Sequence, residues 1–235
     1  MNFLSRLQGI FSNPQPTFRD LSEKPVWVDA LIVLLVALVV FSYLVGPYAQ
    51  KESLQVMKNN VKLQERMGKE RFDQMINRME HPTKASAILR TFILSPITFV
   101  IGFLFSSLVI LVLGRLSSTE GKFRQVFSAL LHANFIDKIL GNALRLVLVL
   151  TRKSVMQTTT SLAIFFPKLE VTSPAFIVLS QVDLFQLWLF GVLAYGLSAI
   201  FKTELKKALF ISYGFWVLKS LLYIAFGLYT ARFIS

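Results

Sequence analysis

The most constraining feature of this chain is an uninterrupted run of uncharged, mostly apolar residues from Leu184 to Phe201. A run of this length is about what an α-helix needs to cross the hydrocarbon core of a bilayer. Lys202, Lys206 and Lys207 follow at once, and lysines commonly hold the cytoplasmic end of a membrane span. The run therefore predicts a transmembrane helix whose carboxyl end faces the cytoplasm.

Small and polar residues around this run predict how the helix begins and how it packs. Ser180 and Asp183 have the S-x-x-D spacing of a capping box, in which side chains satisfy backbone amides at a helix start. Gly191, Ala194 and Ser198 form a stripe of small residues on one face, where a second helix could approach closely. We therefore expect a helix that begins near Ser180 and packs against other helices.

The composition supports a membrane protein and excludes some other classes. Of the 235 residues, 54% are hydrophobic and only 16% are charged, which is less charge than a soluble domain usually carries. There is no cysteine, which excludes disulfides, thiolate metal sites and a cysteine nucleophile. The formal net charge of +12 comes from Lys and Arg spread over loops and helix ends. Basic loops beside apolar spans follow from membrane topology, so we expect no nucleic-acid partner.

Five apolar segments qualify as membrane spans. They cover about residues 26–48, 88–114, 125–150, 180–201 and 208–231. The first is expected to remain as an anchor, because its polar lead is too long for a signal peptide and no A-x-A site follows it. We therefore predict an all-α integral membrane protein with a single domain over residues 1–235. It would be a five-transmembrane-helix bundle with an N-terminal interfacial helix and a helical extracytoplasmic loop.

The N-terminal interfacial helix is predicted for residues 2–12. Its apolar side chains recur at helical spacing and lie opposite a polar face: Phe3, Leu4, Leu7, Ile10 and Phe11 against Asn2, Arg6 and Gln8. Asn13-Pro14 should end this helix, because proline restricts the preceding residue and has no N–H. Two interpretations stay open: an anchor lying on the membrane surface, or a helix that covers the cytoplasmic end of the bundle.

Charged residues interrupt two of the apolar segments. Asp137, Lys138 and Arg145 lie in the third segment and Lys219 lies in the fifth. A charge at mid-membrane costs roughly 3 kcal/mol on insertion scales, so each needs a partner, water or an interface. Asp137 and Lys138 point about 100° apart on a helix, so we expect each to pair with another segment. For Lys219 we expect a carboxylate or carbonyl partner. The third segment is either a buried polar site or, as we favour, a broken or tilted span with structurally satisfied charges.

The polar loop from Lys51 to Glu80 carries two apolar stripes at helical spacing, and Gly68 divides them. The stripe residues are Met57 and Val61 in the first half, and Phe72, Met75, Ile76 and Met79 in the second. Methionine is flexible and polarisable, which suits contact with a partner protein. These residues are therefore candidates for partner binding. The alternatives are that the stripes pack on the protein's own bundle or on lipid headgroups.

The sequence has no motif that would make it an enzyme. It lacks the HExxH of zinc proteases, the GxSxG elbow of serine hydrolases and the glycine-rich loop that cradles phosphates. His81 and His132 are too few for an imidazole-rich metal centre. We therefore expect no catalytic residues, no cofactor and no metal.

Residues Asp183 to Ser198 have the pattern DLFxxWxxxxxAxGLS, followed by a lysine-rich turn. Other stretches resemble the same family: IFSNPQPTF with KPVW after it, GKFRQVFSALLHANF, and SLAIFFP ahead of the fourth span. Together they make the chain resemble the bacterial branch of the Ypt-interacting protein (Yip) family over nearly its whole length. The resemblance implies five transmembrane helices and a cytoplasmic N-terminus, in a multi-pass protein of the bacterial cytoplasmic (inner) membrane.

The resemblance also narrows the function. Eukaryotic relatives act in vesicle traffic with Rab-type GTPases, and some bacterial relatives are encoded beside ABC exporters of the macrolide-efflux type. The family has no established catalytic motif. We therefore expect a noncatalytic membrane scaffold or accessory subunit that binds the lipid bilayer and a membrane-protein partner, such as an ABC exporter or membrane-trafficking machinery. The alternative is a small transporter or channel component that uses the intramembrane charges.

Overall fold

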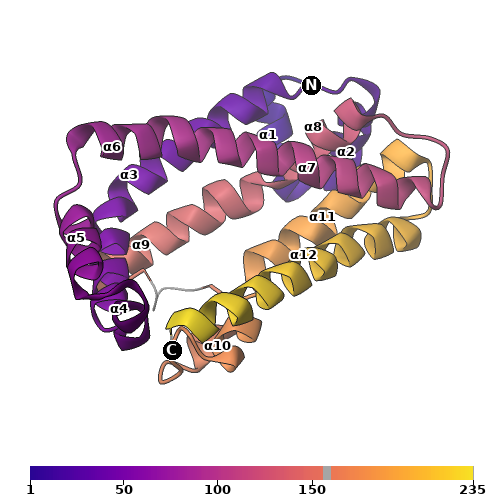
Figure 1. The fold of residues 1–235 in the computed structure, drawn as a ribbon. Helices are drawn as coiled ribbons and strands as arrows, with labels where there is room; N and C mark the ends of the chain where they lie inside the picture. Colours follow the sequence, from indigo (N-terminus) through magenta and orange to yellow (C-terminus); the bar gives the residue numbers. More distant parts are fainter. Residues whose placement is uncertain (156–159, 235) are drawn as a thin grey trace. The chain divides into compact units, whose positions relative to one another are not determined.

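The computed structural model describes residues 1–155 and 160–234, and its regular structure there is helical apart from one isolated antiparallel bridge. The first half contains α1 (Phe3–Ser12), α2 (Pro14–Glu23), α3 (Val28–Lys58), α4 (Val61–Met67), α5 (Lys69–Glu80), α6 (Lys84–Ile88), the π-helix η1 (Leu89–Leu94) and α7 (Ser95–Arg115). The second half contains α8 (Phe123–Ala133), the π-helix η2 (Ile136–Gly141), α9 (Asn142–Arg152), the 3₁₀-helix η3 (Leu162–Phe165), α10 (Pro174–Leu179), α11 (Leu184–Phe201) and α12 (Leu205–Ile234) (Figure 1).

Four helical stretches in the described part of the chain are long and apolar enough to cross a membrane. They are Val28–Lys58, Lys84–Arg115, Leu184–Phe201 and Leu205–Arg232. The all-α prediction is confirmed, and these four spans coincide with four of the five that the sequence predicts. The remaining segment is divided among α8, η2 and α9, with its charged residues at and after the π-helical turns.

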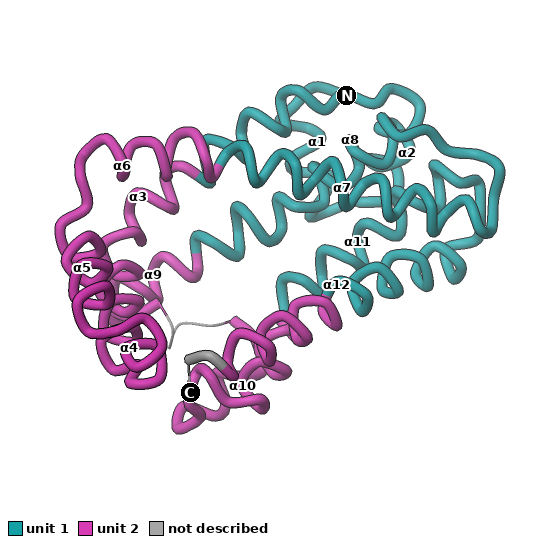
Figure 2. Tube along the Cα trace, viewed as in Figure 1, with its two compact units in different colours: residues 1–38, 96–143, 184–219 teal, residues 39–95, 144–183, 220–235 magenta. Residues whose placement is uncertain are grey.

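The described helices form two compact units, which Figure 2 distinguishes by colour. Unit 1 comprises Met1–Leu38, Pro96–Ala143 and Leu184–Lys219. Unit 2 comprises Val39–Ser95, Leu144–Asp183 and Ser220–Ser235.

The core of unit 1 forms around α11, which packs against α2 and α8. Leu193 and Leu197 of α11 are fully buried, and so is Phe18 of α2. The close approach of these helices depends on Gly196, because a Cβ there would lie 2.8 Å from the Phe18 ring and 3.2 Å from the Ala129 methyl group. Every residue from Val126 to Asp137 is buried. The α8 segment is therefore an inner element of unit 1.

The N-terminal helices belong to this packing. As predicted, α1 ends at Ser12 before Asn13-Pro14, and a second helix, α2, begins at Pro14, a favoured first helical residue. Ile10 is fully buried, and the Phe3 ring meets the Phe135 ring edge-on at 6.0 Å. Within unit 1, α1 therefore packs on other helices, as the second interpretation requires, while the cytoplasmic location in that interpretation stays a prediction.

The expected orientation of α1 is wrong in one respect. Arg6, placed on the polar face, is only 5% exposed, whereas Leu4 is 72% exposed. The reason is that the Arg6 guanidinium finds partners inside: it donates to the Met1 carbonyl oxygen at 2.9 Å and pairs with the Asp29 carboxylate at the start of α3. An ion pair with a hydrogen bond offsets the desolvation that makes buried arginine rare.

Candidate functional site

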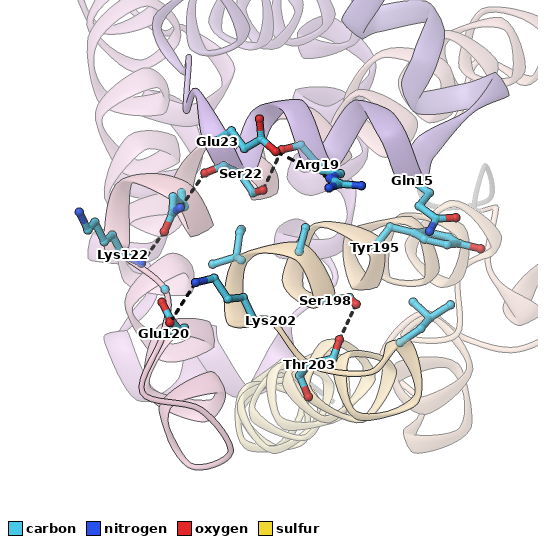
Figure 3. A pocket seen from close by; sticks show the side chains of 15 residues that line it. Gln15, Arg19, Ser22, Glu23, Glu120, Lys122, Tyr195, Ser198, Lys202 and Thr203 are labelled. Carbon is cyan, nitrogen blue, oxygen red and sulfur yellow. Dashed lines mark hydrogen bonds and ion pairs between the residues drawn. The ribbon is translucent and has the colours of Figure 1, made fainter.

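A cleft of about 710 Å³ opens in unit 1 and brings together three segments that are far apart in the sequence. One wall is α2, a second is the stretch 120–125 at the start of α8, and the floor is the last turn of α11 with the turn into α12. Figure 3 shows the lining side chains, including Arg19, Tyr195 and Lys202. The rim is charged, and part of the floor is apolar. Such a cleft suits a partner with both polar and apolar groups.

The floor of the cleft is fixed by the way α11 ends. Lys202 has a φ of 49°, the left-handed conformation that usually terminates a helix at a glycine. Thr203 donates its N–H to the Ser198 carbonyl at 3.1 Å, and the Ser198 hydroxyl donates to the Thr203 carbonyl at 2.6 Å. These two reciprocal bonds complete the helix cap. Ser198, predicted as a helix-packing residue, lines the cleft and caps α11.

The Phe201 ring joins this cap to the loop after α7. A Cβ at Gly114 would lie 2.0 Å from that ring, and one at Gly121 would lie 2.6 Å from it. The glycine at 121 also adopts a φ of 94° that side chains disfavour. The Ser118 hydroxyl donates to the Phe201 carbonyl at 2.6 Å. Both glycines are therefore required for this loop to lie against the end of α11.

The second wall is held to α2 by Gln125. Its side-chain amide donates to the Ser22 carbonyl at 2.6 Å and accepts the backbone N–H of Lys122 at 2.8 Å. The charges on the rim are arranged in ion pairs: Lys202 with Glu120 at 3.1 Å, and Arg19 with Glu23 at 3.7 Å. The rim therefore offers exposed charges of both signs on a hydrogen-bonded frame.

A buried polar group lies elsewhere in unit 1, around His132. The His132 Nδ1 atom lies 2.8 Å from the Ser128 carbonyl, and the Ser128 hydroxyl donates to the Val26 carbonyl at 2.6 Å. His132 is fully buried, and its Nε2 has no hydrogen-bond partner among the residues that the structure describes. Across residues 1–155 and 160–234, no group of three or more His, Asp or Glu residues is placed to hold a metal ion.

Asp137 and Lys138 do not behave as their sequence positions predict. The expectation that they would not pair with each other is wrong, because the Lys138 ammonium lies 2.8 Å from the Asp137 carboxylate. Although their Cβ atoms diverge, the flexible four-carbon stem of lysine can curl back to the preceding residue. Both lie in the π-helix η2, and the Asp137 side chain is only 2% exposed.

In unit 2, Arg145 pairs with Asp183 at 3.1 Å, and the Thr160 hydroxyl also donates to the Asp183 carboxylate. The predicted capping box is wrong. The helix α11 begins at Leu184, and the Ser180 hydroxyl donates to the Ile177 carbonyl at the end of α10. Ser180 is the C-cap of α10, and the Asp183 carboxylate binds Arg145 and Thr160, which are distant in sequence.

Lys219 has the carbonyl partner that the sequence predicts. Its ammonium donates to the Gln186 side-chain oxygen at 2.7 Å and lies 5.0 Å from the centroid of the Phe190 ring. A charge above an aromatic face gains further electrostatic stabilisation. This contact joins α12 to α11 within unit 1.

The small-residue stripe of α11 is only partly a packing surface. A Cβ at Gly191 would lie 3.0 Å from the Tyr213 hydroxyl oxygen of α12, and Ala194 is fully buried. Of the two glycines in α11, the one with the closer interhelical contacts is Gly196, which the predicted stripe misses. The sequence feature that could have indicated Gly196 is its position in the GLS of the family pattern DLFxxWxxxxxAxGLS.

The predicted partner-binding residues of the loop 51–80 are mostly covered within the protein. Phe72 and Ile76 are buried, and the three methionines Met57, Met75 and Met79 are half-buried. Only Val61, at 63% exposed, presents a large apolar surface. Gly68, with a φ of 78°, separates α4 from α5 as predicted. The stripes therefore favour packing on the protein's own helices.

Together, the helical fold and its four long apolar stretches define a multi-pass membrane protein. Residues 9–227 match the Yip1 domain family, and the chain belongs to that family. No curated protein and no solved structure matches the chain. The family assignment confirms the resemblance that the sequence predicts.

Proposed function

We propose that the protein is a noncatalytic membrane scaffold or accessory subunit that binds another membrane protein through the cleft of unit 1. The observation that carries the proposal is the convergence of α2, the loop 116–122 and the end of α11 on one cleft. Hydrogen bonds and glycine contacts hold these segments in place. A preorganised surface loses little conformational freedom when a partner binds.

The cleft also supports a five-span topology. Lys122 and Lys202 line the same cleft and would therefore lie on the same side of the membrane. The chain between them would then cross the membrane an even number of times. Since α11 accounts for one crossing, the segment from α8 through α9 supplies another. The lysines at positions 202, 206 and 207 favour a cytoplasmic location for this end. The N-terminus would then be cytoplasmic, in a bacterial inner membrane.

The pairing of the intramembrane charges favours a scaffold over a transporter. Arg145 has Asp183, Lys138 has Asp137 and Lys219 has Gln186 as partners. Charges engaged in this way stabilise helix contacts, whereas a transport site has to offer groups to its cargo. By family resemblance, the partner is an ABC-type exporter assembly or membrane-trafficking machinery.

Photocross-linking in native membranes tests the proposal. A photoreactive amino acid replaces either Gln15 or Lys122, which line the cleft, and the control position is Arg124, an exposed residue of α8 outside the cleft. We expect both cleft positions to capture the same membrane protein, with the charge reversal Glu120→Lys reducing its yield. Equal capture from Arg124, or no reduction by Glu120→Lys, would exclude the cleft as the contact.

A topology assay tests the span count separately. A reporter joined after Ser118 should be active on the cytoplasmic side, and one joined to the C-terminus should report the opposite side. Reporters that fall on the same side would contradict the five-span arrangement.

A further inference from the structure

An apolar groove of about 530 Å³ runs along unit 1 between the last turns of α7 and the first turns of α12. From the end of α7 and the turn after it, the groove is lined by Leu113, Leu116 and Ser117. From α12 it is lined by Lys207, Phe210, Ile211, Gly214 and Leu218, which share one face of that helix at helical spacing. This groove is separate from the cleft of the proposed function.

Two large apolar side chains of the groove are unusually exposed. Leu116 is 81% exposed and Phe210 is 73% exposed. Such side chains side by side mark a surface that binds another apolar body. Both helices are candidate membrane spans, one ending at Arg115 and the other beginning at Leu205. The groove therefore lies at the ends of two spans, where lipid acyl chains meet their headgroups.

Gly214 keeps the groove open. A Cβ built at this residue would meet no heavy atom within 4 Å, so the space over it belongs to the groove and is not filled by the protein. Glycine in a helix interior costs about 1 kcal/mol relative to alanine. In the described part of the chain, no helix packs closely against Gly214, which leaves the space for a ligand.

Lys207 supplies the charge at one end of this otherwise apolar lining. It is exposed and lies one turn before Phe210 and Ile211 on the same helix face. A cation at the end of an apolar groove is complementary to the phosphate of a lipid whose acyl chain lies in the groove. A second copy of the chain would instead have to place an acidic group there.

From this juxtaposition we propose that the groove is a binding site for one anionic phospholipid. An acyl chain lies over Gly214 between α7 and α12, and the headgroup phosphate binds the Lys207 ammonium. The lipid thereby covers Leu116 and Phe210. Binding requires both parts of the lipid, the acyl chain and the negatively charged headgroup.

The test is native mass spectrometry of the full chain in mild detergent, titrated with phosphatidylglycerol or with phosphatidylcholine of the same acyl chains. The wild type should prefer phosphatidylglycerol for the first lipid bound by about fivefold, the factor expected from one lysine near a lipid of net negative charge, because the choline cation of phosphatidylcholine offsets its phosphate. Lys207→Ala should remove this preference. Gly214→Leu, which fills the groove, should remove the first binding event for both lipids.

Two matched controls accompany these variants. Lys206→Ala removes the same charge one residue away, outside the groove. Gly102→Leu adds the same side chain on α7 at another glycine with no heavy atom within 4 Å of its Cβ position. Both should bind lipid like the wild type. Melting temperatures should be similar for all four variants, because none removes a packed side chain.

Three outcomes would overturn the proposal. In the first, Lys207→Ala and Gly214→Leu bind both lipids like the wild type. In the second, glycerol phosphate without acyl chains displaces the lipid, which would indicate a soluble phosphate site. In the third, Gly214→Leu converts a cross-linked dimer to a monomer with lipid binding unchanged, which would assign the groove to a second copy of the chain.

Discussion

The Arg145 guanidinium and the Asp183 carboxylate lie 3.1 Å apart, although 38 positions separate them in the sequence. Their side chains are only 19% and 11% exposed. Asp183 also accepts a hydrogen bond from Thr160, and its backbone forms an antiparallel bridge with Ser161. This cluster therefore links α9 to the residue that precedes α11.

Replacing one member of that pair should destabilise the protein. Asp183→Asn removes the negative charge but keeps the size of the side chain, and leaves a largely buried guanidinium without its counter-ion. We expect the free energy of unfolding to fall by about 2 kcal/mol, measured by denaturation in mild detergent. The double variant Arg145→Met, Asp183→Leu should lose less than the single variant. An unchanged stability for Asp183→Asn would show that the pair contributes nothing.

Gly196→Ala should also destabilise the protein, because the new methyl group would lie 2.8 Å from the Phe18 ring and 3.2 Å from Ala129. Overpacking of this kind costs about 1–3 kcal/mol. The control is Gly214→Ala, where no heavy atom lies within 4 Å of the Cβ position, and the better helix propensity of alanine should raise stability slightly. Equal effects of the two substitutions would contradict the close contact between α11 and α2.

Acid should loosen the contact between α5 and the end of α3. The hydrogen bond from the Lys58 ammonium, which outweighs the opposing effect of desolvation, lowers the pKa of Glu80 from its ordinary value of 4.5. A lowered carboxylate pKa means that the interaction stabilises the contact above pH 4.5 and is lost as the pH falls through the lowered value. Hydrogen exchange in α5 should therefore rise in acid. Lys58→Met should raise the Glu80 pKa, and an unchanged value would disprove the pairing.

The positions of the spans could be predicted because they depend on composition and length. The segment 180–201 corresponds to α11 at Leu184–Phe201, and 208–231 corresponds to the candidate span Leu205–Arg232. The predicted start at Ser180 lies four residues before the observed one, because Ser180 is the C-cap of the preceding helix α10, which the S-x-x-D pattern does not reveal.

The cleft could not be predicted from local patterns, because its walls come from three segments far apart in the chain. One signal was nevertheless present. Two stretches that carry the family resemblance, at 121–135 and 183–198, supply Gln125 and Ser198 to the cleft, and a third, at 10–18, supplies Gln15. Similarity confined to separate stretches is expected when those stretches meet in space.

Because the apolar stripe of α5 packs within the protein itself, replacing its side chains should destabilise the protein. The triple variant Met75→Ser, Ile76→Ser, Met79→Ser removes one buried and two half-buried side chains. We expect the purified protein to lose at least about 2 kcal/mol of stability without any partner present. The control, Val61→Ser, changes an exposed residue and should be neutral. A triple variant that melts like the wild type but no longer binds a partner would restore the docking interpretation.

Asp137→Asn distinguishes a structural role of the η2 charges from a transport role. The side chain of Asp137 is 2% exposed and lies 2.8 Å from the Lys138 ammonium, so the substitution removes a charge partner inside unit 1. We expect a loss of about 1–3 kcal/mol in detergent, with correct insertion into the membrane. Lys138→Met tests the same pair from its more exposed side and should cost less, because the lysine is 34% exposed. If Asp137→Asn kept its stability and insertion but abolished a measurable ion or solute flux, the pair would be part of a transport path and the scaffold proposal would fail.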